Sequence, residues 1–160
     1  MQRPYVFRLE ENKRVARKMI EALNKRDLVS LDELVDRDYV DHYHQLQGLD
    51  NYKQFLSVLL KAFPDWDETI EGIIAEGDQV WFRFRATATH TGDYHGYFPL
   101  AGKEITLAPT GRKITPVGYV AYRIFDGKIV EGWEISNLFE IYLQLGIIEP
   151  TEKSKELFSK

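Results

Sequence analysis

The four histidines of the sequence fall in two short windows, His42 with His44 and His90 with His95. Imidazole is the side chain that ordinarily titrates near neutral pH, so either window could move a proton at pH 7. A metal site needs three well-placed ligands, and either window offers at most a pair at suitable spacing. We therefore expect no metal. Each histidine either transfers protons or binds ligand, or it holds the local backbone by a hydrogen bond.

Several kinds of chemistry are excluded by composition. The chain has no cysteine, which removes thiolate zinc sites, iron–sulfur clusters and cysteine nucleophiles. It also lacks a nucleophile elbow, a phosphate-binding glycine loop and a zinc-protease motif. With 21 Lys and Arg against 25 Asp and Glu, the net charge is -4. We therefore expect no nucleic acid or membrane partner, and we expect a cytoplasmic location because the chain does not start with an apolar run.

Helical patterns fill the first 65 residues. Apolar residues recur at helical spacing over 15–23 and over 52–63. A capping box over 30–33 predicts a short helix between them, with Ser30 as its cap. Asp50 is the expected N-cap of the later helix, and Pro64 ends it because a residue before proline avoids the helical conformation.

From residue 64 onward the apolar period changes to two, which predicts strands over 69–76, 80–89, 113–125 and 128–135. Asp126-Gly127 is typical of a tight hairpin turn between the last two. The Gly- and Pro-containing stretch 92–111 is interpreted as an extra hairpin or lid. A helix is expected over 138–145, ending at Gly146, and residues 149–160 are expected to form a polar, mobile tail.

Helices followed by antiparallel strands predict an α+β fold in which the helices pack on one face of a curved sheet. Such an arrangement encloses a pocket, and aromatic-rich strands would line it with apolar surface. For each aromatic, the alternative is ordinary core packing. The candidate substrate-binding residues are Phe55, Leu59, Phe82, Phe84, Tyr119, Trp133 and Ile135, with His44 at the pocket mouth.

Eight short motifs carry a family resemblance. They are Tyr39-Val-Asp-His42, Phe63-Pro-Asp65, Ala75-Glu-Gly-Asp78, Thr87-Ala-Thr-His-Thr-Gly92, Pro109-Thr-Gly-Arg112, Asp126-Gly-Lys-Ile129, Glu131 with Trp133, and Gln144-Leu-Gly146. In this order the sequence resembles the SnoaL-like polyketide cyclase or ester cyclase family of the nuclear transport factor 2-like superfamily. The resemblance implies a single domain over residues 1–148, a cone-shaped α+β barrel around one pocket, no cofactor, and a homodimer through the sheet.

The resemblance also implies a catalytic aspartate in the last strand, four residues after the tryptophan. Asn137 stands at that position. An amide can hydrogen-bond a carbonyl group but cannot take up a proton at neutral pH. A second departure is an expansion from Tyr97 to Ala108, where the family has a short link, and it is expected to lengthen the lid.

If the chain is catalytic without this aspartate, another group must transfer the proton. We rank His90 and His42 above Glu134 and Glu140, with Asn137 polarising a carbonyl group or capping the next helix.

Strand alternation supports this ranking. It places Trp133, Ile135 and Asn137 on one face of the last strand, which we infer is the pocket face, and so it points Glu134 away.

Three hypotheses remain open at this stage. The first is a cofactor-free cyclase, isomerase or lyase that acts by general acid–base chemistry on a small, largely apolar carbonyl compound. The second is a small-molecule binding protein on the same scaffold, motivated by the loss of the aspartate. The third is a structural dimer or protein-interaction domain, which a completely filled interior would favour.

Overall fold

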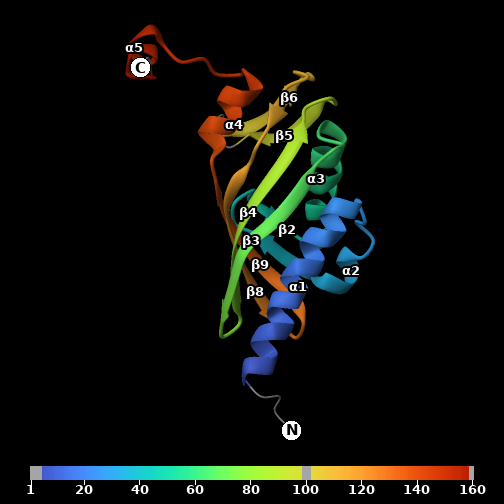
Figure 1. Ribbon diagram of the computed structural model, residues 1–160. Helices are drawn as coiled ribbons and strands as arrows, with labels where there is room; N and C mark the ends of the chain where they lie inside the picture. Colours follow the sequence, from blue (N-terminus) through green and yellow to red (C-terminus); the bar gives the residue numbers. More distant parts are fainter. Residues whose placement is uncertain (1–4, 99–101, 159–160) are drawn as a thin grey trace.

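The computed structural model describes residues 5–98 and 102–158. Helices α1 (Tyr5–Lys25), α2 (Leu31–Leu34) and α3 (Leu49–Ala62) lie on one side of a curved sheet, as Figure 1 shows. The sheet contains β1 (Val35–Asp41), β2 (Leu46–Gln47), β3 (Asp67–Glu76), β4 (Gln79–Thr89), β7 (Lys113–Ile114), β8 (Val117–Phe125) and β9 (Lys128–Ser136).

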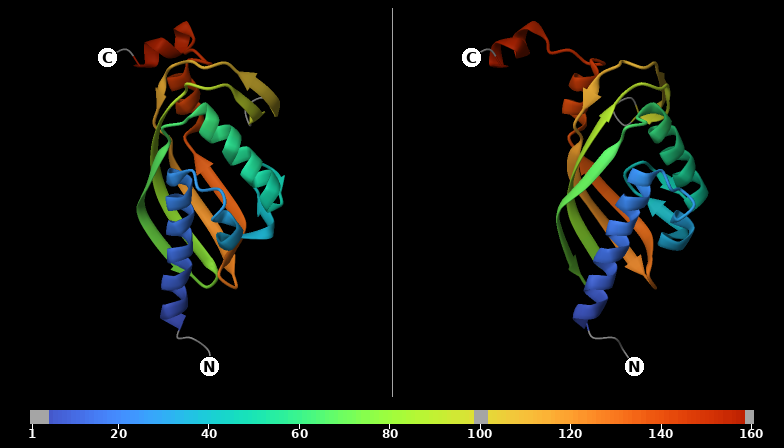
Figure 2. Two further views of the ribbon diagram at one scale, coloured as in Figure 1. Left: turned by 90° about the vertical axis from the view of Figure 1, so that its right-hand side faces the viewer. Right: turned by 45° about the vertical axis from the view of Figure 1, so that its right-hand side comes forward.

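The strand order of this sheet is β2-β1-β9-β8-β4-β3, and β7 pairs with β4. All pairings are antiparallel except that of β1 with β9, which is parallel. The sheet curls around α1 and α3 (Figure 2). The predicted α+β class, with a curved sheet under N-terminal helices, is confirmed. The expected strand 113–125 is broken at residues 115 and 116, between β7 and β8.

The extra segment before β7 forms a second, separate sheet. Among the residues that the structure describes, strands β5 (Tyr94–Phe98) and β6 (Lys103–Leu107) pair with each other alone, in antiparallel orientation. The expected hairpin is confirmed, and Figure 2 shows it at the end of the main sheet, close to α3.

Alternation decides which side chains enter the core. Along β4, Val80, Phe82 and Phe84 are buried, whereas Trp81 and Arg83 between them are exposed. The apolar side chains on the inner face pack against α1 and α3, and burial of such groups is the main favourable term in folding. The inner face of the sheet and the apolar faces of the helices therefore form one hydrophobic core.

A bulge interrupts the alternation in β9. Arg123 of β8 pairs with Glu131 and Ile124 pairs with Ile129, so Val130 is left without a partner in the ladder. An extra residue in one strand shifts which side chains face inward beyond it. After the bulge, Gly132 and every second residue following it lie on the helix side.

Three predicted helix ends can be compared with the structure. The predicted stop before Pro64 is confirmed, since α3 ends at Ala62 and Phe63 is no longer helical, with φ of -128° and ψ of 72°. The predicted capping box at Ser30 is wrong: the Ser30 backbone is itself helical, and its hydroxyl donates to the Asp27 carboxylate instead. Asp50 lies in the first turn of α3, because the helix already begins at Leu49.

The C-terminal segment contains two helices. Helix α4 (Leu138–Leu145) ends at Gly146, whose φ of 72° is the left-handed conformation expected there. Residues of the tail, expected to be mobile, form the short helix α5 (Glu152–Phe158), which projects from the rest of the chain in Figure 2. None of the helices in the described ranges has the length and apolarity required to span a bilayer.

Two glycines in strands give a matched test of this packing. A Cβ at Gly118 of β8 would lie 2.3 Å from the Ile135 carbonyl oxygen and 2.9 Å from Phe84, so Gly118→Ala should lower the free energy of unfolding by about 1–3 kcal/mol. A Cβ at Gly72 of β3 would meet nothing within 4 Å, so Gly72→Ala should change it by less than about 0.5 kcal/mol. Urea denaturation measures both, and equal losses would contradict this packing.

Candidate functional site

A cavity of about 190 Å³ lies between the helices and the inner face of the sheet. Most of its lining is apolar and comes from α1, α3, β4, α4 and the β5–β6 hairpin. The volume is below the roughly 300–1,000 Å³ of drug-sized ligand sites, but exceeds an engineered cavity of about 150 Å³ that takes up benzene. The interior is therefore hollow enough for a small ring compound.

One wall of the cavity is built on a turn after β1. The Asp41 carboxylate is buried, and its Oδ1 accepts the backbone N–H groups of Tyr43 at 3.0 Å and His44 at 2.9 Å. Its Oδ2 lies 2.9 Å from His44 Nδ1. The turn brings His44 into the cavity wall, where its ring packs against Phe55 with centroids 4.1 Å apart.

This contact defines the proton positions on His44. A carboxylate accepts hydrogen bonds, so Nδ1 carries a proton and the neutral ring keeps its lone pair on Nε2. Asp41 thus orients the imidazole as a base whose accepting atom is Nε2. The same carboxylate would stabilise the imidazolium formed when that atom takes a proton.

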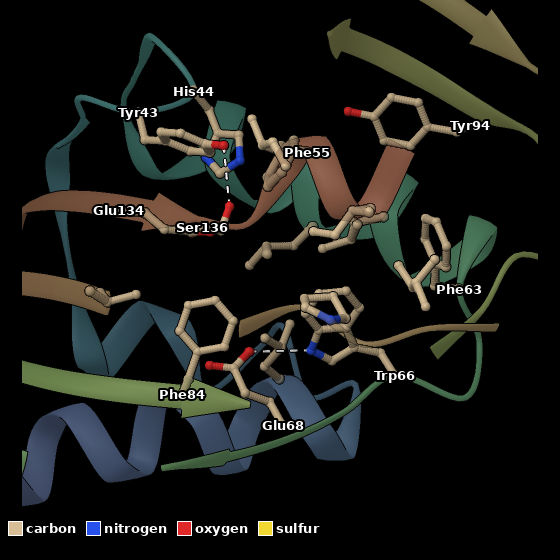
Figure 3. A pocket seen from close by; sticks show the side chains of 18 of the residues that line it. Tyr43, His44, Phe55, Phe63, Trp66, Glu68, Phe84, Tyr94, Glu134 and Ser136 are labelled. Atoms are coloured by element: carbon tan, nitrogen blue, oxygen red, sulfur yellow. Dashed lines mark hydrogen bonds between the residues drawn. The ribbon is translucent and has the colours of Figure 1, made fainter. Parts of the chain in front are cut away.

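Glu134 of β9 lines the cavity on the same wall (Figure 3). Burial raises the pKa of the Glu134 carboxyl, and the Asp41 charge acts in the same direction, whereas His44 and a hydrogen bond from Ser136 oppose the rise. The Tyr43 hydroxyl lies 3.3 Å from Ser136 Oγ. Ser136 hydrogen-bonds to both Glu134 and Tyr43, so the three groups form a connected polar strip.

Glu68 and Trp66 lie on the opposite side of the cavity in Figure 3, near Phe84. Trp66 Nε1 donates to Glu68 Oε2 at 3.3 Å. Burial, with a smaller contribution from the charge of Glu134, raises the pKa of Glu68 to about 8. The cavity therefore has carboxyl groups on two separate walls.

Within the described ranges, no three His, Asp or Glu side chains gather closely enough to hold a metal ion. The polar side chains of the cavity wall instead hydrogen-bond to one another, in pairs or in short chains.

Of the residues proposed from the sequence, four line the cavity: Phe55, Leu59, Phe84 and His44. Phe82 is buried next to Tyr122 but is not part of the lining.

The expected inward orientation of Trp133, Ile135 and Tyr119 is wrong. All three are exposed on the outer face of the sheet, Ile135 by 77%. Alternation correctly grouped Trp133 with Ile135, but the bulge at Val130 and the helices select the other face for the interior. Glu134, expected to point away, is the residue that lines the cavity.

His42 and His90, ranked first as proton carriers, lie outside the cavity lining. His42 stacks on exposed Trp133 with centroids 4.6 Å apart, and its Nε2 lies 2.9 Å from Glu131 Oε2. His90 is fully buried beside Phe63, and its Nδ1 accepts the Thr110 backbone N–H at 3.2 Å. Burial lowers the pKa of His90, which favours the neutral ring in this structural contact.

Asn137 also lies outside the cavity lining, and its expected inward orientation is wrong. Its Oδ1 accepts the Val117 backbone N–H at 2.9 Å, and its Nδ2 donates to Glu140 Oε2 at 2.9 Å and to the Thr115 carbonyl oxygen at 3.4 Å. It stands at the N-cap position of α4, but its side chain makes no capping bond. Asn137 therefore ties the start of β8 to the start of α4.

Sequence reasoning missed Asp41, Tyr43, Glu68, Glu134 and Ser136 as lining or orienting residues. A signal existed for Asp41, whose spacing from His44 allows contact if the backbone turns. None existed for Glu68, which is one of four acidic residues in a mostly exposed strand.

Comparison with known proteins places the chain in a family. The family model described as SnoaL-like polyketide cyclase matches residues 13–145, so the chain belongs to this family. No curated protein matches the sequence.

Solved structures show the same fold. AclR from Streptomyces galilaeus, described as a proposed hydroxylase, is 27% identical with a TM-score of 0.75, covering 94% of this chain and 90% of its own. IdmH from Streptomyces antibioticus, described as a proposed polyketide cyclase, is 28% identical with a TM-score of 0.68 over 84% and 98%. A SnoaL-like protein from Jannaschia is 16% identical with a TM-score of 0.74 over 93% and 99%.

The geometry makes a specific prediction for Asn137→Asp. The change removes the donor to Glu140 and sets two carboxylates against each other, so the free energy of unfolding at neutral pH should fall by about 1–2 kcal/mol, without gain of activity. Glu140→Gln in the same chain should restore most of this loss, since an amide donor then faces the new carboxylate. Thermal unfolding of both variants measures the effect; a gain of turnover in the single variant would contradict the structural role.

Proposed function

We propose that the chain is a cofactor-free enzyme of cyclase, isomerase or lyase type, acting by general acid–base chemistry on a small, largely apolar carbonyl compound. The observation that carries the proposal is the Asp41–His44 pair beside Glu134 in the wall of a largely apolar cavity. A base held by a carboxylate in the wall of a largely apolar cavity is an arrangement suited to proton transfer from carbon.

The proposed chemistry follows from the proton positions. His44 Nε2 removes a proton from the carbon next to the substrate carbonyl, and the electron pair of that C–H bond becomes an enolate. Asp41 stabilises the resulting imidazolium, as a carboxylate partner does. The enolate carbon then bonds to a second electrophilic carbon of the same molecule in a cyclisation, or takes back a proton elsewhere in an isomerisation.

Glu134 is the second proton carrier in this scheme. Its raised pKa keeps a larger fraction of it protonated near neutral pH than an exposed glutamate would have. A protonated Glu134 can give its proton to the oxygen formed in the product, while Ser136 and Tyr43 hold its position. Two groups with different protonation states on one wall suit a reaction that both removes and adds a proton.

The relatives support a reaction of this kind without naming it. IdmH carries the description of a polyketide cyclase and AclR that of a hydroxylase, at 28% and 27% identity. Different activities are thus ascribed to similar scaffolds, and the side chains in the cavity determine which activity a given protein has.

A second candidate function is a non-catalytic binding protein for the same class of small molecule. It is favoured by Asn137, which replaces the aspartate of the family pattern and is bonded within the fold.

The enzyme proposal is tested with two histidines that differ in position but not in type. His44→Gln should lower the rate of hydrogen–deuterium exchange next to the carbonyl of indan-1-one by roughly 10²–10⁴-fold, because it removes the base. His42→Gln, on the outer face, should leave the rate within about twofold. Asp41→Asn should lower it less than His44→Gln, since the base remains but loses its charged partner. Proton NMR in D₂O measures the exchange.

Binding of indan-1-one without any exchange above the solvent rate would favour the binding protein. Equal losses in His44→Gln and His42→Gln would contradict the assignment of the base.

We further propose that the outer face of the sheet pairs with a second copy of the chain. Trp81 and Trp133 lie in one row across β4, β8 and β9, and Tyr119 and Ile135 lie in the next. This forms an exposed apolar patch larger than scattered surface residues would make. The neighbouring cations Arg83 and Arg85 are already paired with Glu71 of the same chain, which suits an uncharged, self-complementary partner better than an acidic one.

Ile135→Glu should convert the dimer to a monomer, because it buries a charge in the proposed interface. Val29→Glu, at an exposed apolar residue in the turn between α1 and α2, should leave the dimer intact. Sedimentation velocity at micromolar concentration measures the mass. A monomeric wild-type chain, or a dimer that survives Ile135→Glu, would contradict the interface.

A further inference from the structure

Glu68 has the most unusual environment of the acidic side chains in the cavity wall. It belongs to β3, and the residue is only 8% exposed. Its backbone is fixed to α1 at both polar groups: Asn24 Nδ2 donates to the Glu68 carbonyl oxygen at 2.8 Å, and the Glu68 N–H donates to Asn24 Oδ1 at 2.9 Å. The carboxyl group is therefore held in place by a rigid frame.

The surroundings of the carboxyl group favour its neutral form. Among titratable groups, Glu134 from β9 acts on it, and the Glu134 charge disfavours ionisation; the Tyr122 phenol from β8 in turn feels the Glu68 charge. Apolar side chains of α1, of β4 and of the residue that follows α3 also line the cavity: Met19, Ile20, Leu23, Phe84 and Phe63. In the described ranges, no cationic side chain forms an ion pair with Glu68. A buried carboxylate without a cation is strongly disfavoured relative to the protonated acid.

The indole of Trp66 determines which oxygen carries the proton. Trp66 Nε1–H can only donate, and it lies 3.3 Å from Oε2, so it favours Oε2 as the carbonyl-type oxygen, the stronger acceptor of a neutral acid. The proton of the neutral acid therefore resides on Oε1. This hydroxyl is a hydrogen-bond donor in the wall of an apolar cavity, and in such a site a donor selects a ligand acceptor.

We propose that Glu68 binds ligand as a neutral carboxylic acid, donating from its Oε1 hydroxyl to a carbonyl oxygen placed on the opposite side of the cavity from Glu134 and His44. The substrate class is thereby narrowed to compact ring ketones with one carbonyl oxygen directed away from the Asp41–His44 pair. The inference deepens the proposed function, but it concerns binding alone.

The same hydroxyl makes ketone binding depend on pH. Loss of the Glu68 proton, which has a pKa of about 8, replaces the donor by a negative charge that repels a carbonyl oxygen. Affinity for a ketone should therefore be full at lower pH and fall as the pH rises through this value. Affinity for a hydrocarbon of the same shape should change little.

The test compares indan-1-one with indane, which share one ring skeleton and differ in the carbonyl group. Ligand-observed NMR titration of the full chain measures both dissociation constants at about pH 6.5 and about pH 9.5, on either side of the transition. The wild-type chain should prefer the ketone by roughly 3- to 10-fold at the lower pH, the value of one neutral hydrogen bond, and should lose that preference at the higher pH.

Two variants separate the donor from the charge. Glu68→Gln keeps an N–H donor and removes the titration, so its ketone preference should persist at both pH values. Glu68→Leu removes the donor, so it should bind indane and indan-1-one equally at both. A carboxylic acid carbonyl band in the infrared difference spectrum at neutral pH, absent from Glu68→Gln, should show the proton directly without any ligand.

The proposal is overturned if Glu68→Leu keeps the ketone preference, if the wild-type preference does not change with pH, or if neither ring compound binds. It can fail while the enzyme proposal stands, because hydrogen exchange that depends on His44 does not require the Glu68 donor. Conversely, a ketone preference that follows these rules without any exchange would support the donor and reject the base.

Discussion

The buried carboxylate of Asp41 is the contact on which the site depends. It accepts the backbone N–H groups of Tyr43 and His44 and faces the His44 ring, so a strand that would otherwise continue outward turns back toward α3. A buried charge with three donors is well satisfied, whereas the same charge without them would be costly. The turn therefore fixes the tautomer of His44, its contact with Phe55 and the position of the cavity wall at the same time. The same Asp41 contact therefore determines both the path of the chain and the proton positions at this wall.

Much of the fold could be predicted because it follows from local rules. The stop of α3 before Pro64, the left-handed Gly146 and the turn at Asp126-Gly127, with φ of 49° and 79°, each reflect the backbone limits of a few residue types. Alternation in β4 identified its buried side correctly because apolar and charged residues are cleanly separated there. The order of helices before strands predicted the curved sheet under the helices, and the family resemblance implied the same arrangement.

The candidate site was less predictable because β9 has its apolar residues on the outer face and its polar residues on the inner face, the reverse of the usual arrangement. Its outer face carries Trp133 and Ile135, and its inner face carries Glu134 and Ser136, so a rule that turns apolar residues inward selects the wrong side. Such a reversal is expected where one strand contributes the polar groups of a cavity wall and its outer face is an apolar surface. His42 and His44 also separated, because the chain turns between them.

The unpaired Val130 in the bulge affects the orientation of every later side chain in β9. This one unpaired residue lies between the buried Ile129 and the segment that carries Glu134. It therefore determines which side chains of the rest of β9 face inward. Without this extra residue the two faces of β9 beyond it would exchange places, so Glu134 would become surface while Trp133 and Ile135 filled the cavity. The hollow interior therefore depends on one inserted residue.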